Sequence, residues 1–332
     1  MMNTIIGGIE KLKEAARLIR KGEIVAFPTE TVYGLGADAF NASACLKIFE
    51  AKGRPADNPF IVHIEKIDDL DRVAKKPSGL VLKLFEKFAP GPLTLILNKR
   101  SEIPEIVTAG LDTIGVRIPN HKMALALISE AKTPIAAPSA NVSGSVSPTI
   151  AQHVYEYMKG RINLILDGGA CSQGIESTIV DMTSKIPTIL RPGSISKADL
   201  LTVLDIVDDR FDANIDKPMA PGMKYKHYAP TIPCACVASS ETAKLLYESN
   251  VESDPVIIAS TGFISKFDNK FNCLSLGLSY KENSAKLYAQ MKKAEKQYGY
   301  IILQYFDVNE GADKFSGLNN RIIKACGGNL FL

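Results

Sequence analysis

Four basic side chains mark the places in this sequence where chemistry is most plausible. Each lies beside glycine or proline or at the end of a predicted strand, and they are Lys52, Arg54, Arg117 and Arg191. A solvated surface cation is the alternative for any one of them taken alone. The planar fork of arginine suits carboxylate and phosphate groups. Together the four predict a binding site for a ligand that carries such groups.

Hydroxyl and amide side chains fill the loops between these cations. They are Thr29, Thr31, Asn58, Ser139, Asn141, Ser143, Ser145, Ser147 and Ser177. Ser147 has a second explanation, because it stands where the N-cap of a predicted helix over residues 148–159 would be. A helix N-terminus also binds phosphate through its free N–H groups, so both explanations can hold at once.

The polar stretch from Pro28 to Gly36 follows an apolar run, Ile24 to Phe27, directly. Proline, threonine, glutamate and tyrosine would make a poor core segment, and two glycines close the stretch. Open α/β sheets place their ligands at the carboxyl ends of strands. We therefore expect this stretch to face the ligand, with Asn41 or Ser43 capping the helix that follows it.

Several well-known sites are absent from the sequence. No phosphate-binding P-loop pattern and no nucleophile elbow occur, and the four histidines (His63, His121, His153 and His227) are too scattered to predict a metal cage. Gly34 to Ala39 matches a variant of the dinucleotide fingerprint weakly, since no acidic residue ends a second strand at the expected distance. The residues alone therefore predict a cationic, hydroxyl-lined site but leave the reaction open.

Strand and helix patterns alternate along the whole chain. Several strands follow one another without a helix between them, which favours a twisted, mixed α/β sheet over a regular doubly wound one. The predicted helices are 9–19, 42–52, 80–88, 121–130, 148–159, 284–297 and 315–325. The predicted strands are 24–27, 59–64, 93–97, 113–118, 134–138, 164–166, 177–181, 189–190, 256–259 and 301–303.

Three regions follow from these patterns. Residues 1–204 form the first α/β domain, residues 205–233 a linker, and residues 234–332 a smaller, Rossmann-like α/β domain. The linker contains proline and glycine between Pro221 and Pro230, which rules out a continuous helix, yet it is rich in basic, aromatic and histidine side chains. We expect this segment to act as a lid over the ligand.

The composition is that of an ordinary globular protein. The 332 residues are 46% hydrophobic and 23% charged, with a net charge of +3 that does not demand nucleic acid. No apolar run has membrane-spanning length, and the N-terminal pattern is amphipathic and not that of a signal peptide. Six scattered cysteines are typical of structural thiols in a reducing compartment. We therefore expect a soluble, cytoplasmic protein that contacts no membrane.

An ordered set of motifs resembles one known family, the YrdC-like threonylcarbamoyl-AMP synthases. The order and spacing agree over roughly the first two hundred residues, and the linker and second domain resemble the long, two-domain branch. The motifs are PTETVYGLG (28–36), KGRPADNP (52–59), PGPLT (90–94), VRIP (116–119), PSANVSG (138–144), ESTIV (176–180), LRPG (190–193) and PGMKYKHYAP (221–230).

The resemblance implies an enzyme that joins L-threonine, bicarbonate and ATP to give threonylcarbamoyl-adenylate and pyrophosphate. It would be a nucleotidyltransferase that needs Mg²⁺ with its ATP and acts in tRNA modification, and a transferase complex would pass the product to tRNA. Direct binding of tRNA is left open. By similarity, Lys52 and Arg54 are catalytic, and threonine is held by Thr31, His63, Arg117 and Ser177. ATP is held by Lys52, Arg54, Asn58, Thr113, Ser139, Asn141, Ser147, Arg191 and Tyr228, and no metal ligand is expected from the protein.

One departure and two rivals accompany the resemblance. Relatives carry a hydroxyl residue shortly before the PSAN motif, where this chain has Ala136 and Ala137. A non-catalytic RNA-binding module is the first rival, although near-neutral charge and the lack of stacking motifs count against it. The second is an enzyme that uses carbamoyl-adenylate chemistry in metal-centre maturation, but the zinc-finger and acylphosphatase patterns of such enzymes are missing.

Overall fold

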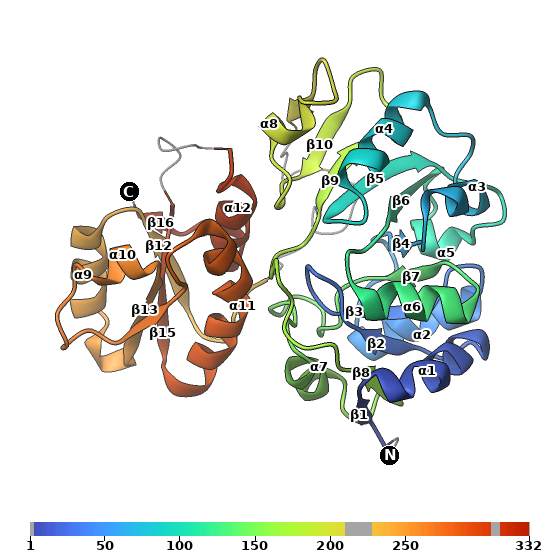
Figure 1. Ribbon diagram of the computed structural model, residues 1–332. Coiled ribbons are helices and arrows are strands. Elements are labelled where there is room, and N and C mark those ends of the chain that lie inside the picture. The colour runs from blue at the N-terminus through green and yellow to red at the C-terminus, as the bar shows by residue number, and fades with distance from the viewer. Residues whose placement is uncertain (1–2, 210–227, 307–312, 332) are drawn as a thin grey trace. The chain divides into compact units, whose positions relative to one another are not determined.

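The computed structural model describes residues 3–209, 228–306 and 313–331. The chain divides into two compact units (Figure 1). The first consists of residues up to 143, 148–171 and 176–225, and the second of 144–147, 172–175 and the chain from 226 onward. Most of the predicted lid, from Pro221 to His227, lies outside the described residues. The predicted domain boundaries at 204 and 233 therefore stay predictions.

The first unit is built on a mixed sheet of eleven strands in its described part. Parallel and antiparallel neighbours alternate irregularly across it, which confirms the predicted mixed α/β sheet. In spatial order the strands are β1 (Ile5–Gly7), β8 (Leu164–Leu166), β2 (Val25–Phe27), β3 (Gly34–Asp38), β7 (Ile135–Ala137), β4 (Ile61–His63), β6 (Thr113–Arg117), β5 (Leu93–Asn98), β9 (Thr178–Asp181), β10 (Thr188–Arg191) and β11 (Asp208–Asp209).

Alternation along the central strands separates a core face from a polar face. Val62, Ile114 and Val116 are buried in the main hydrophobic core of the unit. Because successive side chains in a strand point to opposite faces, the residues between them lie on the other face. These are Ile61, His63, Thr113, Gly115 and Arg117. Two of the four residues that the resemblance assigns to threonine, His63 and Arg117, thus share one face of the sheet.

Helices cover both faces of this sheet. Helices α1 and α6 contact each other and pack on β2, β7 and β8, over part of the polar face (Figure 1). Helices α2, α4 and α7 contribute to the main core on the opposite face. The bounds are α1 (Leu12–Arg20), α2 (Ala42–Lys52), α3 (Leu70–Val73), α4 (Gly79–Phe88), α5 (Glu105–Thr108), α6 (Lys122–Ala131), α7 (Ala151–Met158) and α8 (Lys197–Leu200), with short 3₁₀ turns at Ile9–Lys11 and Ile67–Asp69.

The caps of two helices test the predictions directly. Asn41 caps α2 by accepting from the Ala44 N–H at 3.0 Å, as expected. Ser147 does not cap α7, which begins three residues later than predicted, at Ala151. The reason is that carbonyl groups before Ala151 accept hydrogen bonds from other parts of the chain. The Tyr33 N–H donates to the Pro148 carbonyl at 2.9 Å, and the Cys171 N–H donates to the Thr149 carbonyl at 2.9 Å. The N-cap prediction for Ser147 was therefore wrong.

The two glycines at Gly34 and Gly36 belong to strand β3, which the sequence did not predict. A Cβ atom at Gly36 would lie 2.6 Å from Ile135 Cγ2 and 2.8 Å from Phe27 Cε1. Glycine is required here so that neighbouring strands can approach each other. The dinucleotide fingerprint needs these glycines in a turn that opens a helix, so its weak match is accidental.

The second unit is a smaller α/β fold with a fully parallel five-stranded sheet in its described part. Its strands, in spatial order, are β14 (Cys273–Ser275), β13 (Pro255–Ala259), β15 (Tyr300–Gln304), β12 (Cys234–Val237) and β16 (Leu330–Phe331). Its helices are α9 (Ser240–Glu248), α10 (Thr261–Ile264), α11 (Tyr280–Gln297) and α12 (Ser316–Ala325), with a 3₁₀ turn at Val251–Ser253. This parallel arrangement agrees with the predicted Rossmann-like class.

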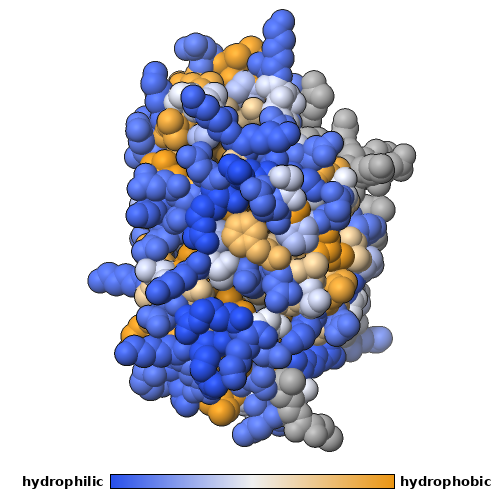
Figure 2. Space-filling view, turned by 90° about the vertical axis from the view of Figure 1, so that its right-hand side faces the viewer, coloured by the Kyte–Doolittle hydropathy of each residue, from blue (hydrophilic) through white to orange (hydrophobic). Residues whose placement is uncertain are grey.

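The outer surface of the first unit is mainly hydrophilic on the face shown in Figure 2, where hydrophobic side chains form only small patches. Across the part of the chain that the structure describes, none of the helices combines the length and hydropathy needed to cross a bilayer.

Candidate active site

Arg117 and His63 form the centre of the site. They end the parallel strands β6 and β4, where their Cα atoms are partners in the ladder, and each side chain is only 4% exposed. Arg117 Nε donates to the Gly91 carbonyl at 3.3 Å, and Arg117 Nη2 lies 2.7 Å from Glu30 Oε1. Strand pairing therefore brings together two residues that were predicted to hold threonine, and it adds a buried carboxylate.

His63 is a neutral side chain in this setting. Burial, reinforced by the positive charge of Arg117, lowers the pKa of His63 to about 3. Its ring meets Phe27 edge-on with 5.9 Å between centroids, and its Nδ1 is buried without a hydrogen-bond partner in the described residues. A neutral imidazole with an unpaired nitrogen can accept or donate a hydrogen bond to a ligand without adding charge.

Ser177, which is predicted to hold threonine, contacts Arg191, which is predicted to hold ATP. Its Oγ lies 2.8 Å from Thr94 Oγ1 and accepts from Arg191 Nη2 at 3.1 Å, while Arg191 Nε donates to its carbonyl at 3.1 Å. Thr94 is placed by β5, which pairs with both β6 and β9. Ser177 and Arg191 are thus brought together at the ends of neighbouring strands, as the site prediction requires.

A second group surrounds Lys52, the last residue of α2. Its Nζ donates to the carbonyls of Ser139 and Asn141, both at 2.5 Å, and Ser139 Oγ donates to Asn141 Oδ1 at 2.5 Å. Burial, together with the nearby charge of Arg54, lowers the pKa of Lys52 well below its ordinary value. The predicted residues Lys52, Ser139 and Asn141 therefore form one buried cluster.

Arg54 and Asn58 are held by the loop that leads from α2 to β4. Arg54 Nη2 donates to the carbonyls of Asn58, at 3.0 Å, and Pro59, at 3.3 Å. The guanidinium carbon lies 5.6 Å from the centre of the Phe60 ring. Asn58 is 1% exposed, and its Oδ1 has no hydrogen-bond partner in the described chain. This buried amide oxygen is free to meet a ligand.

Thr31 lies in the segment between β2 and β3, where local hydrogen bonds fix it. Its Oγ1 is 2.9 Å from Thr29 Oγ1, which also donates to the Val32 carbonyl at 2.6 Å. Tyr33 anchors the end of the segment, because its hydroxyl donates to the Gly169 carbonyl at 2.7 Å. Hydrogen bonds thus fix the segment from Pro28 to Tyr33 as a buried polar loop between the two strands, and its facing a ligand stays a prediction.

Three predicted ATP residues are not gathered with the others by the described contacts. Thr113 lies on the polar face but begins β6, about 13 Å along the strand from Arg117. Ser147 is buried in the second unit. Tyr228 is also in the second unit, where its ring stacks on that of Tyr288 at 5.8 Å and lies 5.3 Å from the Arg321 guanidinium. Their roles stay predictions.

Sequence reasoning missed two residues of this site, Glu30 and Thr94. Both lie inside motifs that were recognised, and Glu30 carries the charge that balances Arg117. The available signal for Glu30 was a carboxylate placed soon after the apolar run Ile24 to Phe27. The two alanines before the PSAN motif add nothing polar: Ala136 is buried in the main core and Ala137 packs with helices α1 and α6.

This arrangement can bind and orient charged groups, but the described contacts pair none of its serines or threonines with a histidine or lysine base. Basic side chains contact hydroxyl, amide or carbonyl groups at each part of it: Arg191 at Ser177, Lys52 at Ser139 and Asn141, and Arg54 at Asn58. Within the described residues, no group of three or more histidine, cysteine, aspartate or glutamate side chains is placed to hold a metal ion. The chemistry that fits is charge stabilisation and positioning.

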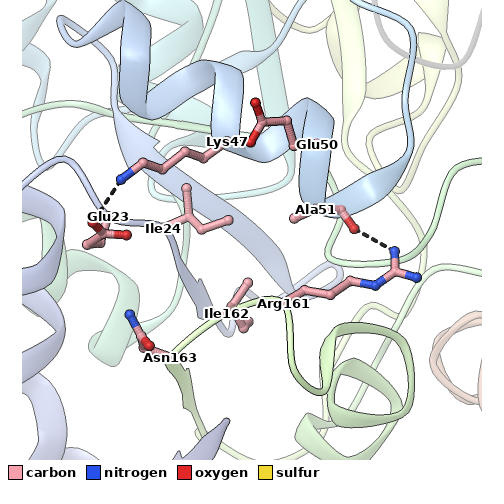
Figure 3. A pocket seen from close by; sticks show the side chains of 8 residues that line it. All are labelled: Glu23, Ile24, Lys47, Glu50, Ala51, Arg161, Ile162 and Asn163. Carbon is pink, nitrogen blue, oxygen red and sulfur yellow. Dashed lines mark hydrogen bonds and ion pairs between the residues drawn. The ribbon is translucent and has the colours of Figure 1, made fainter. Parts of the chain in front are cut away.

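A cavity of about 510 Å³ lies elsewhere on the first unit, beside α2 (Figure 3). None of the predicted site residues lines it. Two contacts lie in the wall of this cavity. Arg161 Nη1 donates to the Ala51 carbonyl at 2.7 Å, and Lys47 Nζ pairs with Glu23 Oε1 at 2.8 Å. The Arg161 contact holds the end of α2 one residue before Lys52.

Comparison with known proteins decides the family. Residues 17–193 match the model of the Sua5/YciO/YrdC family, described as "Telomere recombination". The chain belongs to this family. Residues 195–327 match a second model, "Threonylcarbamoyl-AMP synthase, C-terminal domain". The resemblance to the long, two-domain branch of the family is thereby confirmed.

Relatives with both regions support the same assignment. Proteins named "Threonylcarbamoyl-AMP synthase" from Pyrococcus abyssi and Bacillus subtilis are each 49% identical, over 67% and 72% of this chain and 66% and 70% of their own lengths. The crystal structure of P. abyssi Sua5 complexed with L-threonine superposes with a TM-score of 0.91 at 36% identity, covering 100% of this chain and 99% of that one. Escherichia coli YciO shares the fold of the first unit, with a TM-score of 0.52.

Proposed function

We propose that this protein is a threonylcarbamoyl-AMP synthase, the enzyme that makes L-threonylcarbamoyladenylate for the modification of tRNA. The observation that carries the proposal is the superposition on a threonine-bound family member over the whole chain. Relatives named for this activity at 49% identity support it. By reaction type the enzyme is a nucleotidyltransferase, since it transfers an adenylyl group from ATP.

The residues at the ends of β4 and β6 suit the amino-acid substrate. Arg117 Nη1 has no hydrogen-bond partner in the described chain, so it is available to the carboxylate of threonine. Neutral His63 and the hydroxyls of Thr31 and Ser177 are all buried and suit the hydroxyl and amine of the same molecule. Their assignment to threonine rests on this chemistry and on the family resemblance.

The reaction needs no nucleophile from the protein. The threonine amine and bicarbonate give a carbamate and water, and a carbamate oxygen attacks the α-phosphorus of ATP, so that pyrophosphate leaves. Lys52 and Arg54 would stabilise the negative charge that develops on the phosphate oxygens. Asn58, Ser139, Asn141 and Arg191 would position the nucleotide, with Thr113, Ser147 and Tyr228 assigned to it by similarity alone.

Magnesium is expected with ATP as its phosphate counter-ion. In this proposal the ion is held largely by phosphate oxygens and water. Bicarbonate, the threonylcarbamoyl transferase complex and a cytoplasmic location complete the proposal, and direct tRNA binding stays open.

The proposal is tested by incubating the protein with ATP, L-threonine and bicarbonate. Pyrophosphate release should require all three substrates, and mass spectrometry should detect threonylcarbamoyladenylate. Pyrophosphate without threonine dependence would contradict the proposal. If no adenylate forms while labelled tRNA is retained on a filter, the RNA-binding rival is correct instead.

A further inference from the structure

Glu30 is a buried carboxylate in the loop between β2 and β3. It is 4% exposed, and the Arg117 guanidinium lies 2.7 Å from its Oε1. Burying such a pair removes two charges from water, which costs solvation free energy. The attraction between the charges offsets this loss only when their remaining donors and acceptors are also hydrogen-bonded. A purely structural ion pair in this position should therefore have its other polar atoms hydrogen-bonded.

The pair is not satisfied in this way. Neither carboxylate oxygen of Glu30 accepts a well-aligned hydrogen bond from the described residues, and Oε2 lacks even an ion-pair partner. On Arg117, Nε is used by the Gly91 carbonyl and Nη2 faces Glu30, which leaves Nη1. Buried polar atoms without partners call for a specific explanation, and a bound ligand is one. The pair thus presents one unused anionic atom and one unused cationic atom side by side.

We propose that Glu30 is a specificity-determining residue that binds the ammonium group of the amino-acid substrate, while Arg117 binds its carboxylate. An α-amino acid carries both charges on a single carbon atom, so its zwitterion fits a site with one anion and one cation. This inference rests on the proposed function, because it concerns the threonine site of that reaction. It adds a residue that was not among those assigned to threonine.

Two titratable groups on which the charge of Glu30 acts, Cys171 and His121, do not compete for the ammonium. Burial raises the pKa of the Cys171 thiol and lowers that of the His121 imidazole, so both are uncharged at neutral pH, and Glu30 is the anion whose charge acts on each of them. His63, beside Arg117, is neutral as well. A substrate without the amine would bring a second negative charge beside Glu30, with Arg117 as the one printed partner of both carboxylates.

The test compares L-threonine with (R)-3-hydroxybutanoate, which keeps the carboxylate and the hydroxyl but lacks the amine. Calorimetry should show that the wild-type protein prefers threonine at least tenfold. In Glu30→Gln, threonine should bind at least tenfold more weakly while hydroxybutanoate binds as well as before or better. Glu105→Gln is the matched control. Glu105 is exposed on α5, and its carboxylate lies 2.9 Å from Lys99 Nζ. This variant should prefer threonine over hydroxybutanoate as strongly as the wild type does.

Equal weakening of both ligands in Glu30→Gln would overturn the proposal, because Glu30 would then act only by holding Arg117. Should that variant fail to fold, the double variant E30Q/R117Q removes both charges, and a retained preference for threonine would overturn the proposal equally. Pyrophosphate release by the wild-type protein is measured in parallel. Its absence would refute the proposed function, whereas release together with an unchanged preference in Glu30→Gln would refute only the role of Glu30.

Discussion

At the scale of single residues, the site combines basic side chains that can bind anionic substrate groups with a histidine, His63, that is neutral. Lys52 is the most confined cation, with its ammonium between the carbonyls of Ser139 and Asn141. Lys52→Met keeps the length of the side chain but removes the charge. Loss of one preorganised donor commonly lowers kcat by about 100- to 1,000-fold. We expect a loss of that size in pyrophosphate release at saturating threonine and ATP.

The control for this prediction lies on the same helix. Lys47 is half-exposed and pairs with Glu23, away from the site. Lys47→Met should leave pyrophosphate release within about twofold of wild type, since exposed ion pairs contribute only about 0–1 kcal/mol to stability. If Lys52→Met were as active as Lys47→Met, the assignment of Lys52 to the phosphates would be wrong.

His63 gives the folded protein a defined pH dependence. Its pKa is about 3 when folded, against an ordinary histidine pKa of 6.5, so between these limits the unfolded chain binds the proton and the folded chain does not. The free energy of unfolding must therefore fall as pH falls below about 6.5. Between pH 7.5 and pH 5, His63 should lower the free energy of unfolding by about 2 kcal/mol. This follows from the roughly 1.5 pH units between 6.5 and 5, at about 1.36 kcal/mol each.

Urea unfolding at these two pH values measures the effect. His63→Gln cannot take up this proton, so its free energy of unfolding should change by about 2 kcal/mol less between pH 7.5 and pH 5 than that of the wild type. The same pH dependence in both proteins would show that His63 is protonated in the folded state, contrary to its burial.

At the scale of elements, the sequence predicted the strands and helices that have regular patterns. Helix α2 is predicted to the residue because Asn41 caps it and Gly53 ends it with a left-handed φ of 58°. Strand β3 was missed because its glycines resemble a loop, and glycine is rare in strands. The start of α7 was missed because the carbonyls of Pro148 and Thr149 accept hydrogen bonds from Tyr33 and Cys171, which are distant in sequence. Local patterns cannot reveal such distant partners.

Gly36 in β3 tests the explanation given for that strand. In Gly36→Ala the new methyl group would meet Ile135 and Phe27 at less than 3.0 Å. Overpacking of this kind costs about 1–3 kcal/mol, so the midpoint of urea unfolding should fall accordingly. Gly79→Ala is the control, because a Cβ atom at this exposed start of α4 meets nothing within 4 Å; it should be neutral or slightly stabilising. Equal stability of both variants would contradict the close approach of strands at Gly36.

At the scale of the whole molecule, the site depends on chain segments that only the fold brings together. The motifs identified Arg117 and located Glu30, but nothing in the sequence pairs them, because their contact depends on the order β3-β7-β4-β6 in the sheet. The same holds for Thr94 and Ser177, which meet because β5 and β9 are neighbours. Residue types could thus be predicted from motifs, whereas their pairing required the topology.

The division of the chain into units is likewise not a simple cut. Two loops that precede residue 176, at 144–147 and 172–175, belong to the second unit, where the Ala229 N–H donates to the Gly144 carbonyl at 3.2 Å. Gly174 packs against helix α11 so closely that a Cβ atom would lie 2.4 Å from Ala285 Cα. The second unit therefore includes two loops that lie outside the continuous stretch of chain from residue 226 onward.

Gly174→Ala should consequently destabilise the C-terminal sheet, although the substitution lies about 60 residues before the first strand of that sheet, β12 (Cys234–Val237). The added methyl group meets backbone atoms that cannot move aside easily, and the φ of +71° adds strain for any residue with a Cβ atom. Hydrogen exchange of the β13 and β15 amides should become faster than in wild type. Gly160→Ala carries the same backbone strain, at a φ of +78° in the first unit, with nothing within 4 Å of its Cβ. Exchange in β13 and β15 should not change in that variant, and if the two variants gave the same result, the loop at 172–175 would not be part of the second unit's packing.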